Sequence, residues 1–153
     1  MKNLDRTDLK ILQALQSEGR LTNQTLAARV ALSPSACLAR IRQLEAAGVI
    51  SGYHAHVALE LVRPTLFIYA EISLKRHSPA EFMRFESMVK EIPEVVEAVQ
   101  VSGQFDYLLK IVVPDIRAWR ELAVRLQDEG GVEKVFTHVV LKDAKTFSGY
   151  PLK

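Results

Sequence analysis

The spacing of apolar residues changes near Pro64 and divides the chain into two parts. Before Pro64, apolar side chains recur every three or four positions, which is the period of an amphipathic helix. The first run, around Leu9 and Leu12, ends at Gly19. After Pro64 the period becomes two in several segments, as expected for strands with one buried face. The pattern therefore predicts an all-helical first part and a mixed second part.

Three short helices are predicted in the first part, each with a residue suited to cap its N-terminus. Asp5, Thr22 and Ser33 stand at the predicted starts, and Pro34 occupies the first helical position after Ser33. Residues 49–53 are predicted to be extended, like the wing of a winged helix-turn-helix. The third helix is expected to bury a face that carries Leu38, Ile41, Leu44 and Glu45.

The second part is predicted to have the order β-α-β-β-α-β, which is typical of a ferredoxin-like fold. Its segments are strand 65–74, a helix from Ser78, strands 95–102 and 106–113, a helix from Asp115 with Ile116, Trp119, Leu122 and Leu126 on its apolar face, and strand 132–142. The predicted fold class is therefore α+β, a winged helix-turn-helix domain joined to a ferredoxin-like βαββαβ domain.

These elements set the expected domain limits. The helix-turn-helix domain is expected over residues 1–53, followed by a connector with some strand character over residues 54–64. The ferredoxin-like domain is expected over residues 65–145. Residues 146–153 form a tail in which no pattern is interpretable.

The strands of the predicted sheet are apolar on both faces. Phe67 and Tyr69 alternate with Ile68 and Ala70 along the first strand. Two helices cover only one face of such a sheet, and a bare apolar face of this size is unusual for a monomer. The second face is therefore expected to pack against another copy, so the chain should be at least a homodimer.

Composition and charge narrow the function further. The single cysteine, Cys37, excludes an internal disulfide and a cysteine-based zinc site within one chain. No apolar run approaches the roughly 18 residues of a membrane span, and the polar N-terminus favours a cytoplasmic protein with no membrane partner. Residues 1–63 carry eight Lys and Arg against five Asp and Glu, a balance of +3, and this excess favours a polyanionic partner.

The third predicted helix is a candidate for contact with double-stranded DNA. In a helix-turn-helix this helix lies in the major groove, where small side chains allow close approach and Arg or Gln donates to bases. Serines at its N-terminus are suited to phosphates. The candidate contacts are Ser33, Ser35, Ala36, Ala39, Arg40, Arg42 and Gln43. The pattern alone also allows an ordinary helical hairpin with a solvated arginine face.

The turn between the second and third predicted strands is a candidate site for a small ligand. Gly103 permits a sharp turn with backbone N–H groups available to a carboxylate. Asp106 offers an acceptor for an α-ammonium group, and Ser102 adds a hydroxyl. Together they suit the two charged ends of a free amino acid. The alternative is a plain hairpin turn in which Asp106 caps the backbone.

Two separated motifs resemble one known family. The segments LDRTDLKILQALQSEGRLTN and RVALSPSACLARIRQLEAAGVISGY, followed by VSGQFDYLLKIVVPD and THVVLK, resemble the Lrp/AsnC (leucine-responsive/asparagine regulator) transcription factors of bacteria and archaea. The resemblance implies a nucleoid-associated homodimer that assembles to tetramers or octamers and responds to an amino acid, with no further cofactor. It implies an effector pocket between dimers formed by Val101, Ser102, Gly103, Gln104, Phe105, Asp106, Tyr107, His138, Val139 and Val140.

Two positions depart from the family pattern, and two other functions stay open. Gln104 stands where relatives often carry an acid, and His138 where several carry tyrosine, so the effector is not assumed to be leucine. Sirohaem decarboxylases share the architecture and would make the chain an enzyme, whereas a sensor acting on a protein partner would need no DNA. His54 and His56 share one side of the connector without an acid or cysteine close by, so no metal site is predicted.

Overall fold

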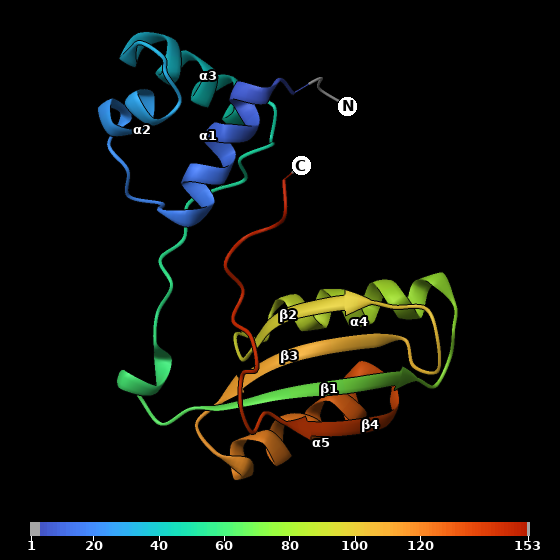
Figure 1. Ribbon diagram of the computed structural model, residues 1–153. Helices are drawn as coiled ribbons and strands as arrows, with labels where there is room; N and C mark the ends of the chain where they lie inside the picture. The colour runs from blue at the N-terminus through green and yellow to red at the C-terminus, as the bar shows by residue number, and fades with distance from the viewer. Residues whose placement is uncertain (1–3, 153) are drawn as a thin grey trace. The chain divides into compact units, whose positions relative to one another are not determined.

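The computed structural model describes residues 4–152 and contains two compact units (Figure 1). The helical unit comprises the chain up to Val57 together with the segment from Lys145 onward, and the sheet unit is Ala58–Ala144. The C-terminal tail therefore groups with the helical unit rather than standing apart. Residues 1–3 of the first predicted domain and residue 153 of the predicted tail lie outside the described residues.

The helical unit is built on three helices whose predicted caps are confirmed. They are α1 (Arg6–Ser17), α2 (Asn23–Arg29) and α3 (Pro34–Ala46), capped by the side chains of Asp5, Thr22 and Ser33. At α1 the cap is reciprocal, because the backbone N–H of Asp8 donates to Asp5 Oδ1 (2.8 Å) and that of Asp5 to Asp8 Oδ2 (3.2 Å).

The buried face of α3 agrees with the prediction at Leu44 and differs from it at Leu38 and Glu45. It is centred on Cys37 and Leu44, which are 0% and 1% exposed, whereas Leu38 is 38% exposed and Glu45 is also exposed. A helix advances about 100° per residue, so a face centred on Cys37 leaves Leu38 at its side. The small core of the unit consists of Ile11, Leu12, Leu26, Ala27, Val30, Cys37 and Leu44.

Residues 49–53 follow α3 without helix or strand, in keeping with the predicted wing, whereas the predicted strand character of the connector is not found. Over the described range 47–65 the only regular element is a 3-10 turn, η1 (Leu59–Leu61). Gly48 turns the chain with a φ of 68°, and the N–H groups of Val49 and Ile50 both donate to Leu44 O, at 2.9 and 3.2 Å. This segment is therefore fastened to the end of α3 and pairs with no strand.

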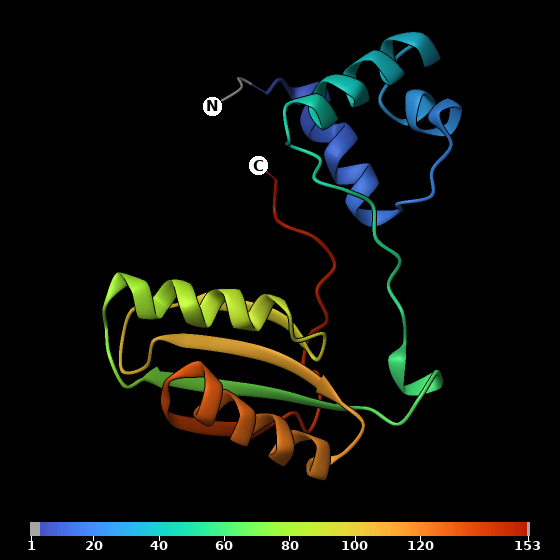
Figure 2. The same ribbon diagram turned by 180° about the vertical axis from the view of Figure 1, so that it is seen from behind.

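The sheet unit has the predicted ferredoxin-like arrangement. Its elements are β1 (Leu66–Leu74), α4 (Pro79–Lys90), β2 (Val95–Gln100), β3 (Tyr107–Val113), α5 (Ile116–Gly130) and β4 (Val132–Val139). The antiparallel sheet has the order β2-β3-β1-β4, and α4 and α5 cover the same face, as Figures 1 and 2 show. β4 ends three residues before the predicted limit, since its pairing with β1 ends at Val139 opposite Ile68.

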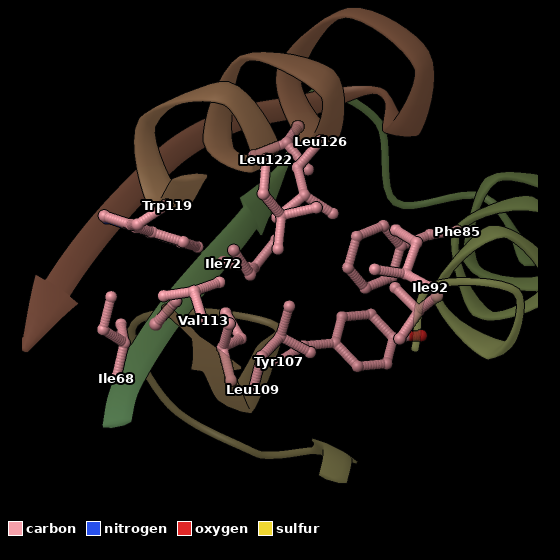
Figure 3. Packing of buried hydrophobic residues seen from close by; sticks show 14 of the residues in the cluster. Ile68, Ile72, Phe85, Ile92, Tyr107, Leu109, Val113, Trp119, Leu122 and Leu126 are labelled. Atoms are coloured by element: carbon pink, nitrogen blue, oxygen red, sulfur yellow. The ribbon is translucent and has the colours of Figure 1, made fainter. Parts of the chain in front are cut away.

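One large apolar core lies between the sheet and its two helices (Figure 3). Phe85 of α4 and Trp119 and Leu126 of α5 pack onto the even-numbered side chains of β1, which include the fully buried Ile72. Ile116, predicted on the buried face of α5, is instead 53% exposed because it occupies the first position of the helix.

The opposite sheet face carries apolar side chains that neither helix of the unit covers. Phe136 is 59% exposed and Tyr69 36% exposed, and Phe67 and Leu108 on the same face are partly buried. Hereafter this surface is called the open face. Among the described residues, no helix combines the length and apolar character needed to cross a membrane.

Candidate DNA-binding surface and effector loop

The exposed side of α3 carries most of the predicted DNA contacts. Ser33, at the N-terminus of α3, accepts a hydrogen bond from the N–H of Ala36 (3.2 Å), and its Oγ lies 3.2 Å from Ser35 Oγ. The exposed predicted contacts are Ser33, Ser35, Ala36, Ala39, Arg42 and Gln43. Small side chains at the middle of this surface and hydroxyl groups at its N-terminus suit a close approach to a polyanion.

Arg40 occupies a different environment from the other predicted contacts. Its Nη1 lies 2.6 Å from Asp5 Oδ2 and 2.8 Å from Asp8 Oδ1, and the Asp8 side chain is only 12% exposed. Hydrogen bonds from the backbone N–H of Asp8 and from Arg40 lower the pKa of Asp5, and the two carboxylates raise the pKa of Arg40. Arg40 thus joins α3 to the N-terminus of α1. The sequence did not show this because the partners lie 32 and 35 residues away.

In the predicted effector loop, the Asp106 carboxylate is bound within the chain. Asp106 Oδ2 accepts a hydrogen bond from the N–H of Leu74 (2.7 Å) and lies 3.1 Å from His77 Nε2. The backbone of the same residue donates to Ile72 O (2.8 Å) and accepts from the N–H of Val101 (2.9 Å). Asp106 therefore caps the backbone, as the plain hairpin alternative requires, and its carboxylate also faces the imidazole of His77.

Four of the predicted loop residues border one hollow of about 220 Å³. Gly103 has a φ of 134°, and a Cβ added to it would have nothing within 4 Å, so glycine serves the turn there rather than close approach. The lining combines Gly103, Gln104, Phe105 and Asp106 with Ser73, Leu74, His77, Glu133 and Lys134. The last five residues are not predicted from the sequence. Leu74 and His77 reach the loop through their contacts with Asp106, and the β1–β4 register, which pairs Ser73 with Lys134, brings β4 to it.

The other predicted effector residues lie elsewhere. Tyr107 borders a second hollow of about 370 Å³ between α4 and β2, where its hydroxyl donates to Glu86 Oε1 (2.8 Å) and burial raises its pKa. His138 lies on the open face with Nε2 2.9 Å from Glu71 Oε1. It is four residues from Lys134 along β4, a span of about 13 Å. Within one chain, the loop and His138, Val139 and Val140 are therefore not brought together.

The described residues contain no cluster of three or more His, Cys, Asp or Glu side chains placed to hold a metal ion. His54 and His56 both lie in the exposed connector. Cys37 is buried in the helical core, where burial raises the pKa of its thiol, as expected of a packing residue.

Comparison with known proteins shows the class to which this architecture belongs. Residues 4–51 match the winged helix-turn-helix DNA-binding model, and residues 68–149 match the Lrp/AsnC ligand binding domain. This combination defines a DNA-binding transcriptional regulator with a ligand-binding domain. The chain belongs to the Lrp/AsnC family.

Individual relatives agree with this assignment over nearly the whole chain. The leucine-responsive regulatory proteins of Escherichia coli (strain K12) and Klebsiella pneumoniae are each 43% identical over 145 residues, 94% of this chain and 88% of theirs. A Neisseria meningitidis transcriptional regulator, solved as an L-Met complex, has a TM-score of 0.92 at 39% identity and covers 98% of this chain and 97% of its own.

A second solved structure, an AsnC family regulator from Agrobacterium tumefaciens, has a TM-score of 0.90 at 35% identity, with 97% of each chain covered. The relatives are transcriptional regulators and not enzymes. The prediction of a transcriptional regulator is therefore confirmed, and the alternative of a sirohaem decarboxylase is not supported.

Proposed function

We propose that the chain reads DNA through the exposed side of α3. Ser33 and Ser35 contact phosphates at the helix N-terminus, Ala36 and Ala39 allow close approach, and Arg42 and Gln43 reach base edges. The observation that carries this proposal is the joint exposure of these six side chains on one helix. Arg40, bound by two carboxylates, positions α3 rather than reading a base.

A steric substitution tests this surface directly. A preferred site is first selected from random DNA with the full chain, and affinities are then measured by gel shift. Ala39→Phe places a bulky ring at the proposed point of closest approach and should abolish specific binding. Val124→Phe, on the exposed side of α5 in the sheet unit, is the control and should bind like the parent. Equal DNA affinity of the two variants would show that DNA does not bind at the exposed side of α3.

We further propose that a free amino acid is the effector and that it binds at the Gly103–Asp106 hollow. The carboxylates of Asp106 and Glu133 suit an α-ammonium group, while Lys134 suits the α-carboxylate. The L-Met complex of the Neisseria relative and the leucine-responsive relatives support this ligand class. Gln104 is neutral and adds no charge to the hollow, so we expect the side chain of the amino acid to be uncharged.

The separation of the loop from His138 within one chain supports an assembled site. We propose that a homodimer forms through the open face and that dimers associate further, to tetramers or octamers, so that a second copy completes the hollow. Sedimentation should show a smaller species for Phe136→Lys on the open face than for Val124→Lys on α5, since both side chains are more than half exposed in the chain. The regulator is proposed to act in the cytoplasm, on the nucleoid.

A thermal-shift screen against the twenty amino acids tests the ligand. A ligand present at about 1,000 times its Kd adds about 4 kcal/mol to the free energy of unfolding. The hit should be lost in Lys134→Met and kept in Lys142→Met, an exposed lysine outside the hollow. Asp106→Ala is a poor test because it also removes the acceptor for Leu74. A blank screen with DNA binding intact would contradict an amino-acid effector.

A further inference from the structure

The C-terminal segment Gly149–Leu152 is bound to α1 in the helical unit (Figure 1). The N–H of Tyr150 donates to Gln16 Oε1 (2.6 Å), and Gln16 Nε2 donates to Tyr150 O (3.2 Å). One turn earlier on α1, Gln13 Nε2 donates to Leu152 O (2.6 Å). Two glutamine side chains of one helix therefore bind the tail backbone as a neighbouring strand would.

An apolar anchor accompanies these hydrogen bonds. Leu152 is partly buried and packs against the small core of the helical unit. The rings of Phe147 and Tyr150, at 5.0 Å between centroids, pack edge to face and stay exposed. The bound segment is thus held by its backbone and by Leu152, while the ring of Tyr150 is dispensable for docking.

The contact between the tail and Gln16 requires glycine at position 149. Its φ of 115° lies in the region that favours glycine, and a Cβ there would lie 2.9 Å from Gln16 Oε1 and 3.1 Å from Gln16 Cβ. Any other residue would be strained and would also displace the glutamine that binds Tyr150. Conformation and space thus select glycine independently of the hydrogen bonds.

We propose that Gly149–Leu152 is a strap that binds the C-terminal end of the chain to the DNA-binding unit. This unit is then connected to the rest of the chain at two places, the connector after Val57 and the segment before Gly149, instead of one. The chain leaves the helical unit after Val57 and returns to it at Lys145. A domain on one flexible linker samples many orientations, whereas a second attachment removes most of them. The strap would therefore restrict where α3 is presented to DNA.

A cleavable connector tests the strap without DNA or effector. A recognition sequence for a site-specific protease is inserted after Ala58 in the full chain, and the cleaved protein is passed over a sizing column. The N-terminal fragment should stay with the remainder through the strap. It should separate in Gly149→Val and in the double variant Gln13→Ala, Gln16→Ala, whose side chains are exposed on α1.

Tyr150→Ala is the control, because its backbone makes the hydrogen bonds and its side chain is 73% exposed. This variant should co-elute like the parent, and circular dichroism should show the same helix content in all proteins. Separation of the cleaved parent, or co-elution of the strap variants, would overturn the proposal.

The consequence for DNA rests on the proposed dimer and is measured separately. When the two half-sites of a selected operator are moved apart by half a helical turn, about 5 base pairs, two rigidly held units cannot engage both. The parent should lose affinity by about a hundredfold. Gly149→Val should lose at least several-fold less. An equal loss would show that the strap, even if docked, does not restrict the unit.

Discussion

The two units of this regulator are stabilised in different ways. The sheet unit has one large apolar core between four strands and two helices. The helical unit has a smaller core and adds polar connections at its margins: the contacts of Arg40 with Asp5 and Asp8, and the bound tail. A small three-helix unit buries little apolar surface, so polar contacts such as those of Arg40 with Asp5 and Asp8 contribute more to the placement of α3.

The two binding sites differ in the same way. The proposed DNA surface lies on one helix, and its residues all come from a single chain. The proposed effector hollow draws on a loop, the end of β1 and the start of β4, and the open face of the same sheet is left uncovered by both helices. The proposal therefore combines ligand binding and assembly in the sheet unit, while the proposed DNA contacts need only the helical unit.

The largest predicted effect separates the two cores. Phe85 is fully buried, with its ring centroid 4.8 Å from that of Tyr107, so Phe85→Ala should cost the sheet unit about 3–5 kcal/mol. Trp119, the single tryptophan, is buried in this core, and its fluorescence in urea reports this unit. Met83→Ala on the same helix, 68% exposed in the parent, is the control and should change stability by less than about 0.5 kcal/mol.

Hydrogen exchange of the α1–α3 amides measures the helical unit in the same Phe85 variant. These amides should keep their protection, because the two cores share no residue. Equal destabilisation of both units would show that they unfold together.

The next prediction separates the two arginines of α3. If Arg42 contacts a phosphate, Arg42→Ala should reduce the slope of log affinity against log salt by about 0.9, and if it contacts a base it should cost about 1–3 kcal/mol at one position of the site. Arg40→Ala should change neither the salt slope nor the preference for a base. It should instead lower the melting temperature, because α3 loses its contact with Asp8. Fluorescence anisotropy across a salt series measures the slopes. A reduced slope in Arg40→Ala would make Arg40 a phosphate contact.

Features that depend on adjacent residues were predictable from the sequence. Asp5, Thr22, Ser33 and Asp115 are N-caps as expected, because a cap and the N–H it binds lie within three residues. The alternation along β1 likewise predicted which side chains share a face of the sheet. The strand order followed from the order of elements, since a β-α-β-β-α-β chain has a common packing solution.

Features that depend on distant residues were not predictable. Leu38 was assigned to the wrong side of α3 because a short helix with few apolar residues does not fix the centre of its buried face. Lys134 reaches the hollow through the β1–β4 register, and His77 through its contact with Asp106, 29 residues away. Gln16 and Tyr150 are 134 residues apart, and a glycine-containing tail has no periodicity to indicate a docking site.

A smaller effect tests whether Ser33 is both a cap and a DNA contact. Ser33→Ala removes the acceptor for the N–H of Ala36 and should cost the helical unit about 1 kcal/mol. Ser33→Asp keeps an acceptor but adds a negative charge, so stability should be retained while DNA affinity falls. Chemical unfolding and gel shift measure the two quantities. Retained affinity in Ser33→Asp would place the phosphates away from this end of α3.

The smallest predicted effect is the pH dependence of the cap at α1. Because hydrogen bonds from Asp8 and Arg40 lower the pKa of Asp5 in the folded state, its charged form stabilises the helical unit above the unfolded-state pKa of about 3.9. That contribution is lost as the pH falls through the folded-state pKa. Asp5→Asn keeps a capping side chain without the charge. The variant should therefore resemble the parent at acidic pH and be less protected above pH about 5, where only the parent carries the charge. Exchange of the α1 amides at both pH values, corrected for intrinsic rates, measures this. If the difference in amide protection between parent and variant is the same at both pH values, the charge on Asp5 adds nothing to the stability that its hydrogen bonds provide. The contacts of Asp5 with Asp8 and Arg40 would then stabilise the helical unit as hydrogen bonds and not through charge.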